Sequence, residues 1–189
     1  MVKIIFPILL MALSFLVERE VLADDSQYQI KTKYTYLVFN SVEDMVVFNR
    51  KINYPSGSFF KRFFSNQSAA EAKNELVEKV DLLFEKVLLI LGMDNQIKKI
   101  RVRLLSNEEQ LEEVFKKIFQ KEKNVRAWYV YELNSVFLHV GDVNAGMLAH
   151  ELGHAIIDHF FSVQPPRATA EILTGYVDDH LYEEVKKYD

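Results

Sequence analysis

Alternating apolar and polar residues predict strands in several short segments of the chain. Residues 33–41 (KYTYLVFNS) and 98–105 (KKIRVRLL) alternate in this way and are rich in residues that favour strands. Residues 126–132 (RAWYVYE) and 135–140 (SVFLHV) are separated by two residues, which predicts a β-hairpin. The polar residues 24–32 show no clear pattern, and we expect them to be loosely held.

Apolar residues spaced three and four positions apart predict helices in the remaining segments. Ser41 is expected to cap the first helix, because acids follow it in the first turn. A long apolar face precedes Gly92, a residue type that commonly ends helices. The sequence SNEE predicts a capping box headed by Ser106. The five expected helices are residues 41–52, 68–91, 106–120, 146–161 and 168–188.

The order of these elements predicts an α+β fold with a small mixed or antiparallel sheet. Strands and single helices do not alternate regularly, so a repeating βαβ arrangement is not expected. Pro165 and Pro166 cannot continue a helix, and they favour a turn after which the last helix runs back antiparallel to the one before it. The chain has 189 residues, and residues 24–189 suit a single domain.

The first residues have the pattern of a secretory signal peptide. Lys3 precedes an unbroken apolar run, residues 4–17, that is shorter than the roughly 20 residues of a membrane-spanning helix. Val21 and Ala23 then match the small-residue pattern before a cleavage point. We expect residues 1–23 to be removed on export, and retention as an amino-terminal anchor is the alternative. The domain is expected on the exported side, periplasmic or secreted, with no stable membrane span after cleavage.

Composition narrows the chemistry that the chain can carry. The net charge of -4 gives no sign of a clustered basic surface, so nucleic-acid binding is not expected. The hydrophobic share of 49% is that of a globular protein. The chain has no cysteine, so disulfides and thiolate ligands are excluded, and any metal ion must be bound by His, Asp or Glu.

Residues 146–161 (GMLAHELGHAIIDHFF) contain the strongest chemical signal. His150 and His154 are four residues apart, so on a helix both side chains lie on one face, about 6 Å apart along the axis. Two imidazoles placed in this way can bind one tetrahedral metal ion. Glu151 lies about 100° further round, within reach of a water molecule on that ion. The alternative is a buried helix whose two histidines are satisfied by hydrogen bonds.

This arrangement of His150, Glu151 and His154 resembles the zincin superfamily of metallopeptidases. It lacks the extension of the metzincins, because Ile157 and Phe160 stand where that extension needs glycine and a third histidine. It is more similar to the gluzincins, in which a glutamate from a following helix is the third ligand. The resemblance covers about residues 143–180, and the preceding hairpin is similar to the substrate-side strands of that fold. It implies a minimal zincin-like fold, a zinc ion (Zn2+) and peptidase activity.

Several acidic and histidine side chains downstream could supply the third ligand. Asp158 shares a face with His154, but a straight helix places it about 12 Å along the axis from His150, too far for one ion. Glu171 lies about one turn into the antiparallel last helix, where its carboxylate can meet His154, and we select it. The alternative for Glu171 is an acid that only complements the helix dipole. The other candidates are His159, Asp178, Asp179 and His180.

A side chain that orients a ligating histidine has one candidate. Asp178 follows Glu171 by seven residues on the same helix face, about level with His150, so it could accept the free ring N–H of that histidine. The gluzincins commonly place such an acid four residues after the glutamate, where this chain has Gly175. A solvated surface acid is the alternative interpretation of Asp178.

A hydrolase also needs a hydrogen-bond donor for the oxyanion that forms as water attacks a carbonyl. Tyr176 and His180 are the candidates nearest in sequence, and Tyr129 or Tyr131 on the hairpin would serve equally well. His139, on the second strand of the hairpin, is expected to be structural.

Together these observations predict a zinc-dependent metallopeptidase that hydrolyses peptide bonds. Its zinc ligands would be His150, His154 and Glu171, and Glu151 would act as the general base. A peptide or protein substrate could pair with the edge strand of the hairpin. Two alternatives stay open: a zincin-fold protein that binds or scaffolds without cleaving, and a zinc hydrolase of a non-peptide amide.

Overall fold

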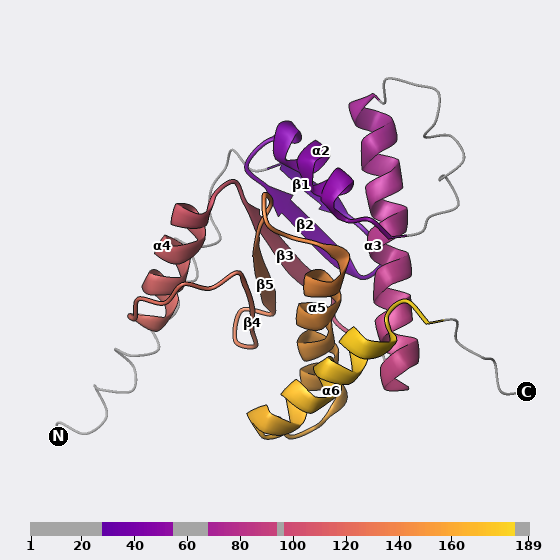
Figure 1. Ribbon diagram of the computed structural model, residues 1–189, viewed down its shortest axis with the longest axis vertical. Helices are drawn as coiled ribbons and strands as arrows, with labels where there is room; N and C mark the ends of the chain where they lie inside the picture. Colours follow the sequence, from indigo (N-terminus) through magenta and orange to yellow (C-terminus); the bar gives the residue numbers. More distant parts are fainter. Residues whose placement is uncertain (1–27, 55–67, 94–96, 184–189) are drawn as a thin grey trace, which may run out of the picture.

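The computed structural model describes residues 28–54, 68–93 and 97–183. The predicted signal peptide lies outside the described residues. In this part of the chain one sheet has the order β1-β2-β3-β5-β4 (Figure 1). Its strands are β1 (Tyr28–Lys31), β2 (Thr35–Phe39), β3 (Ile100–Leu105), β4 (Ala127–Val130) and β5 (Ser135–His139). The helices are α2 (Val42–Lys51), α3 (Ala69–Leu91), α4 (Glu108–Phe119), α5 (Ala145–Phe160) and α6 (Arg167–His180).

The sheet is mixed, with a parallel centre and antiparallel edges. β2 pairs with β3, and β3 with β5, in parallel. β1 pairs antiparallel with β2, and β4 antiparallel with β5. The predicted α+β fold and the hairpin are therefore confirmed. Within the described ranges β4 pairs with β5 alone, so its other side is a free sheet edge.

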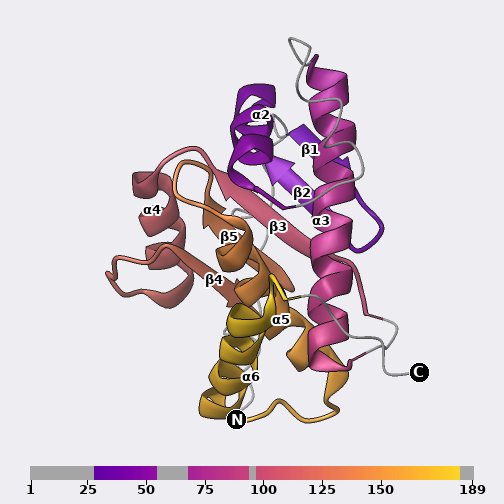
Figure 2. The same ribbon diagram turned by 45° about the vertical axis from the view of Figure 1, so that its right-hand side comes forward.

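Helices cover both faces of the sheet, as Figures 1 and 2 show. On one face α2, α3 and α5 bury the larger core, to which the strands contribute Leu37, Val102 and Leu138. On the other face α4 covers a smaller core in which Trp128 stacks on Phe137 at a ring-centroid distance of 5.2 Å. None of the helices in the described ranges combines the length and apolarity needed to cross a membrane.

The predicted cap of α2 at Ser41 and the predicted end of α3 at Gly92 are confirmed, whereas the cap that starts α3 at Ser68 was not predicted. The Ser41 hydroxyl accepts the backbone N–H of Asp44, and Ser68 forms a complete capping box with Glu71. Gly92 ends α3 with φ +64°, in the left-handed region that glycine enters without a steric cost. For α4 the prediction was wrong by one residue: Asn107, not Ser106, accepts the N–H of a first-turn residue.

The Ser106 hydroxyl is engaged elsewhere, which explains the shifted cap. It lies 2.7 Å from a carboxylate oxygen of Asp44, at the start of α2. By donating to Asp44, the hydroxyl links the end of β3 to the start of α2. The amide oxygen of Asn107 accepts the backbone N–H of Gln110 instead, and so caps α4.

Two element boundaries also differ from the sequence prediction. Residues 28–31, expected to be loosely held, form β1, because Ile30 is buried in the larger core while its neighbours face outwards. Four residues offer too few alternations for that pattern to be recognised. The last helix ends at His180, whereas it was predicted to continue to residue 188, and residues 184–188 lie outside the described ranges.

The two last helices pack against each other in opposite directions, as the proline turn predicted. His150, nearer the start of α5, contacts Asp178 near the end of α6, whereas His154, further along α5, contacts Glu171 near the start of α6. Between these two contacts a Cβ placed at Gly153 would lie 3.1 Å from the methyl carbon of the buried Thr174. Gly153 thus allows the close approach of α6, on which both carboxylates depend.

Candidate metal centre

Helix α5 presents two imidazoles on one face. Asn144 caps its amino terminus by accepting the N–H of Met147, and apolar side chains bury most of the remaining surface. His150 and His154 stand one turn apart with ring centroids separated by 4.9 Å. Their side chains keep 28% and 18% of their surface exposed, so each is firmly packed but still accessible to a small ligand.

Helix α6 adds a carboxylate to the two imidazoles. Oε2 of Glu171 lies 3.7 Å from Nε2 of His150 and 3.7 Å from Nε2 of His154. One ligand atom from each of the three residues falls within 4.8 Å of the others. Donors bonded to a tetrahedral ion at about 2.1 Å stand roughly 3.4 Å apart, so small side-chain rotations suffice to bind one. His150, His154 and Glu171 form a group that could hold a metal ion.

A hydrogen bond fixes the tautomer of His150. Its Nδ1 lies 2.8 Å from Oδ2 of Asp178. An ionised carboxylate can only accept, so Nδ1 carries the proton and Nε2 keeps its lone pair on the side of Glu171. The contact predicted between Asp178 and His150 is therefore present, although the spacing from Glu171 is seven residues instead of four.

His154 has the charge state that a ligand needs. Burial, followed by the electrostatic effect of the adjacent His150 imidazole, lowers the pKa of His154 from 6.5 to about 4. At neutral pH the ring is therefore neutral and can donate a lone pair. The carboxylate of Glu171 opposes this shift but does not outweigh burial.

Glu151 is the most buried acid near the group, with 8% of its surface exposed. Burial raises its pKa from 4.5 to about 7, and the carboxylate of Glu171 acts in the same direction. The charge of His150 and a hydrogen bond from the backbone of Tyr129 oppose that rise. Because Tyr129 belongs to β4, this bond places Glu151 between the free sheet edge and the two imidazoles.

A pocket of about 530 Å³ opens beside these residues. It is lined by His150, Glu151 and Asp178 on one side and by the segment that leads into β4 on the other. The site therefore has the concave shape of a small-ligand or peptide site, with titratable groups at its wall.

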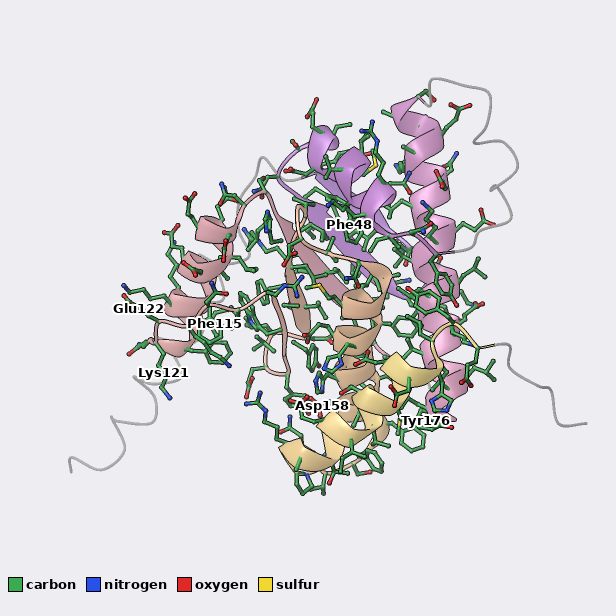
Figure 3. The ribbon with its side chains drawn as sticks, viewed as in Figure 1. Phe48, Phe115, Lys121, Glu122, Asp158 and Tyr176 are labelled. Atoms are coloured by element: carbon green, nitrogen blue, oxygen red, sulfur yellow. The ribbon has the colours of Figure 1, made fainter. Side chains whose placement is uncertain are left out.

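Other predicted candidates do not join the group. Tyr176 follows Glu171 by five residues, about 140° round the helix, and Figure 3 shows it on the outer side of α6, away from β4. The rings of His180 and Tyr176 pack together with their centroids 3.9 Å apart, and Nδ1 of His180 donates to the Tyr176 carbonyl oxygen. The structure thus does not bring Tyr176 or His180 to the candidate metal group of His150, His154 and Glu171. Asp179, one residue after Asp178, is exposed.

The remaining histidine and acid candidates have other partners. Asp158 accepts a hydrogen bond from Gln164, and Nε2 of His159 lies 2.8 Å from the amide oxygen of Asn134. Neither belongs to the candidate metal group. His139, at the end of β5, packs over Gly141, where an added Cβ would come within 2.8 Å of its ring.

The two hairpin tyrosines also lie outside the candidate metal group. The hydroxyl of Tyr129 is buried without a hydrogen-bond partner among the described residues, and burial raises its pKa. Tyr131 is 47% exposed, with its ring 6.5 Å from that of His159. Neither tyrosine is brought into a hydrogen bond with a residue of the group.

Two features escaped the sequence interpretation. Arg167 donates to Oε1 of Glu171 at 3.3 Å, which leaves Oε2 to face the imidazoles. Its position four residues before Glu171 on a predicted helix is a signal that could have been used. Lys123 and Arg126 line the pocket, and no sequence motif marks them.

Two imidazoles and one carboxylate are side chains that could hold a metal ion, and three protein ligands would leave a fourth position of a tetrahedral site for another molecule. Its neighbours supply a buried acid and a pocket. No protein-family model, curated protein or solved structure matches this chain.

Proposed function

We propose that the protein is a zinc-dependent peptidase whose ion is held by His150, His154 and Glu171. The observation that carries this proposal is the approach of one Glu171 oxygen to both Nε2 atoms at the same distance, 3.7 Å. Two imidazoles and a carboxylate are characteristic of catalytic zinc sites. A zinc ion supplies Lewis acidity, which makes a water molecule acidic enough to lose a proton near neutral pH.

Glu151 is the general base in this proposal. A base works best when its pKa lies near the working pH, and burial brings the pKa of Glu151 to about 7 before any cation is added. Its carboxylate can accept the proton of the attacking water and pass it to the leaving amine. The backbone bond from Tyr129 holds Glu151 beside the free edge where a substrate carbonyl would lie.

The free edge of β4 favours an extended peptide as substrate. Within the described ranges β4 pairs only with β5, so, apart from the Tyr129 backbone group that bonds Glu151, the other side of β4 has no strand partner. An extended peptide could pair there by main-chain hydrogen bonds, while its side chains enter pockets. Ala127, the first residue of β4, lines the pocket beside Glu151. These features support a peptide over a non-peptide amide.

We also propose that the enzyme works outside the cytoplasm, in the periplasm or secreted. This rests only on the sequence of residues 1–23, which lie outside the described residues.

Substitution of Glu151→Gln tests the proposed function. The amide keeps the size of the side chain but cannot take up a proton, so we expect zinc binding to persist and peptide turnover to fall about 10²- to 10⁴-fold. A matched control is Glu112→Gln on the exposed side of α4. Zinc content and cleavage of a mixed peptide library are measured for both variants and for the original protein.

Equal turnover in the original protein and Glu151→Gln would contradict the role of Glu151. No turnover in the zinc-loaded original protein would support a binding or scaffold protein instead. Cleavage of small amides without cleavage of peptides would favour the non-peptide hydrolase.

A further inference from the structure

The pocket beside Glu151 has an asymmetric charge. One wall is the segment of residues 123–127, which leads from α4 into β4 (Figures 1 and 2), and it carries two cations, Lys123 and Arg126. The acids that line the same pocket are Glu151 and Asp178, and Asp178 accepts a hydrogen bond from Nδ1 of His150. The two cations thus lie in one short segment, whereas both acids of the pocket have hydrogen-bond partners within the protein, His150 for Asp178 and the Tyr129 backbone for Glu151.

Lys123 is a free cation at this wall. It makes no hydrogen bond or ion pair with any residue in the described ranges, and its side chain is exposed at the pocket. Its neighbour Glu122 pairs with Lys116 at 2.6 Å and so does not neutralise it. An unpaired ammonium group beside a substrate pocket favours an anionic group in the substrate.

Arg126 is held in a fixed orientation beside Lys123. Its Nε and Nη2 donate to the two carboxylate oxygens of Asp142 at 2.5 and 2.8 Å. This pair uses two of the five N–H groups of a guanidinium, so three are left to donate to another acceptor. A guanidinium already oriented by one carboxylate loses little side-chain freedom when it binds a second.

The rest of the pocket is suited to the carbon atoms that carry such an anion. Met147, Leu181 and Tyr182 contribute apolar surface, and Leu181 is buried. A carboxylate on a short aliphatic stem matches an apolar floor with cations at one wall. An inorganic anion has no carbon atoms, so it would make no apolar contacts with these side chains.

We propose that this pocket binds a carboxylate of the substrate peptide through Lys123 and Arg126, an inference that rests on the proposed peptidase function. The carboxylate can belong to an aspartate or glutamate side chain near the cleaved bond, or to the carboxyl terminus of the peptide. The first source describes an endopeptidase with a preference for acidic sequences. The second describes an enzyme that acts near the ends of chains.

Peptide binding to the zinc-loaded Glu151→Gln variant tests the inference without turnover. The probes are fluorescent peptide sets with both ends blocked, in which one Glu is placed at each position in turn. The same sets with Gln in place of Glu serve as neutral partners, and a third set has Gln and a free carboxyl terminus. Affinities are measured by fluorescence anisotropy at low and at high salt.

We expect one of the two carboxylate sets to bind about three- to tenfold more tightly than the blocked Gln set, with the difference reduced by salt. The set that gains identifies the source of the carboxylate. Lys123→Gln and Arg126→Gln, each made in the Glu151→Gln background, should remove most of this preference. The matched control is Lys121→Gln, because Lys121 is exposed but does not line the pocket.

The inference is overturned if all three sets bind equally, or if Lys121→Gln has the same effect as Lys123→Gln. A carboxylate preference in binding, combined with no cleavage by the original zinc-loaded protein, would overturn the proposed function and leave the pocket assignment standing. Cleavage without any carboxylate preference in binding would support the proposed peptidase function and overturn the assignment of the pocket.

Discussion

Nδ1 of His150 lies 2.8 Å from a carboxylate oxygen of Asp178, although the two residues are 28 positions apart in the chain. Two turns before Asp178 on helix α6, Oε2 of Glu171 lies 3.7 Å from Nε2, the other nitrogen of the His150 ring. The His150 imidazole is thus placed between two carboxylates of α6, one at Nδ1 and one near Nε2. This arrangement holds the ring in the tautomer that can bind a metal ion.

Replacing Asp178 by Ala should weaken zinc binding about 10- to 100-fold, the usual effect of losing the partner of a metal-binding histidine. The ligands themselves remain, so zinc still binds at higher concentration. Competition with a chelator of known affinity measures the change. Asp179→Ala is the control because Asp179 is exposed and lies outside the pocket. If Asp178→Ala and Asp179→Ala bind zinc equally well, the orienting role is wrong.

Zinc should raise the melting temperature of the protein. A ligand at 100 times its dissociation constant stabilises the folded state by about 2.7 kcal/mol, which for a domain of this size corresponds to a rise of roughly 5 to 10 °C. His154→Ala should remove most of that rise, because it removes one of the three ligands. Melting curves with zinc and with chelator provide the measurement, and an unchanged curve for the original protein would rule out a metal-binding site.

Gly153→Ala should destabilise the protein by about 1 kcal/mol or more. The added methyl would lie 3.1 Å from the Thr174 methyl carbon, and the Thr174 hydroxyl is tied to the carbonyl of Ala170. Adding Thr174→Ser, which removes that methyl, should recover part of the loss. Gly175→Ala is the control: nothing lies within 4 Å of its Cβ position, so it should stabilise α6 slightly. Urea unfolding compares the four proteins.

A stabilising or neutral Gly153→Ala would show that α5 and α6 are not closely packed at this point. Measured alongside stability, zinc affinity should fall in Gly153→Ala, because a displaced α6 carries Glu171 and Asp178 with it.

Without metal, Glu151 and His154 should affect stability in opposite directions as pH changes. The pKa of Glu151 is about 7 in the folded state and 4.5 in the unfolded chain, so between these pH values the folded state binds more protons than the unfolded state. The free energy of unfolding therefore falls as pH rises through this range. The pKa of His154 is about 4 in the folded state and 6.5 in the unfolded chain, so its contribution to the free energy of unfolding rises with pH over that range.

Glu151→Gln removes only the first of these effects. Relative to the original protein, the chelator-treated variant should therefore gain stability between pH 5 and pH 7.5, by about 2 kcal/mol. Urea unfolding at the two pH values measures the gain. A difference between the proteins that does not change with pH would mean that Glu151 titrates normally and is not buried as the structure describes.

Local features of the sequence predicted most of the fold. Ser41 and Gly92 act within a few residues of their own positions, so the start of α2 and the end of α3 could be derived from the chain itself. Ser106 could not be assigned correctly, since its partner Asp44 is 62 positions away. The mixed order of the sheet likewise depends on which strands meet in space, and a helix-period or strand-period pattern does not specify that.

The candidate site was predictable where helix geometry applied. The four-residue spacing placed His150 and His154 on one face, and the proline turn placed Glu171 and Asp178 opposite them. The pocket wall was not predictable, because Lys123 comes from a loop and no periodic pattern relates it to α5 or α6. Tyr176 was proposed only for its nearness in sequence to Glu171, and helix geometry turns it to the opposite side.

In the proposed function, zinc held by α5 and α6 is used to hydrolyse peptides. A titration of the metal-free protein with zinc, while cleavage of a mixed peptide library is followed, tests both the metal and the reaction. We predict that cleavage is absent without zinc, rises in proportion to added zinc and reaches its plateau at one zinc ion per chain. Cleavage that is independent of zinc, or no cleavage by the fully loaded protein, would contradict the account.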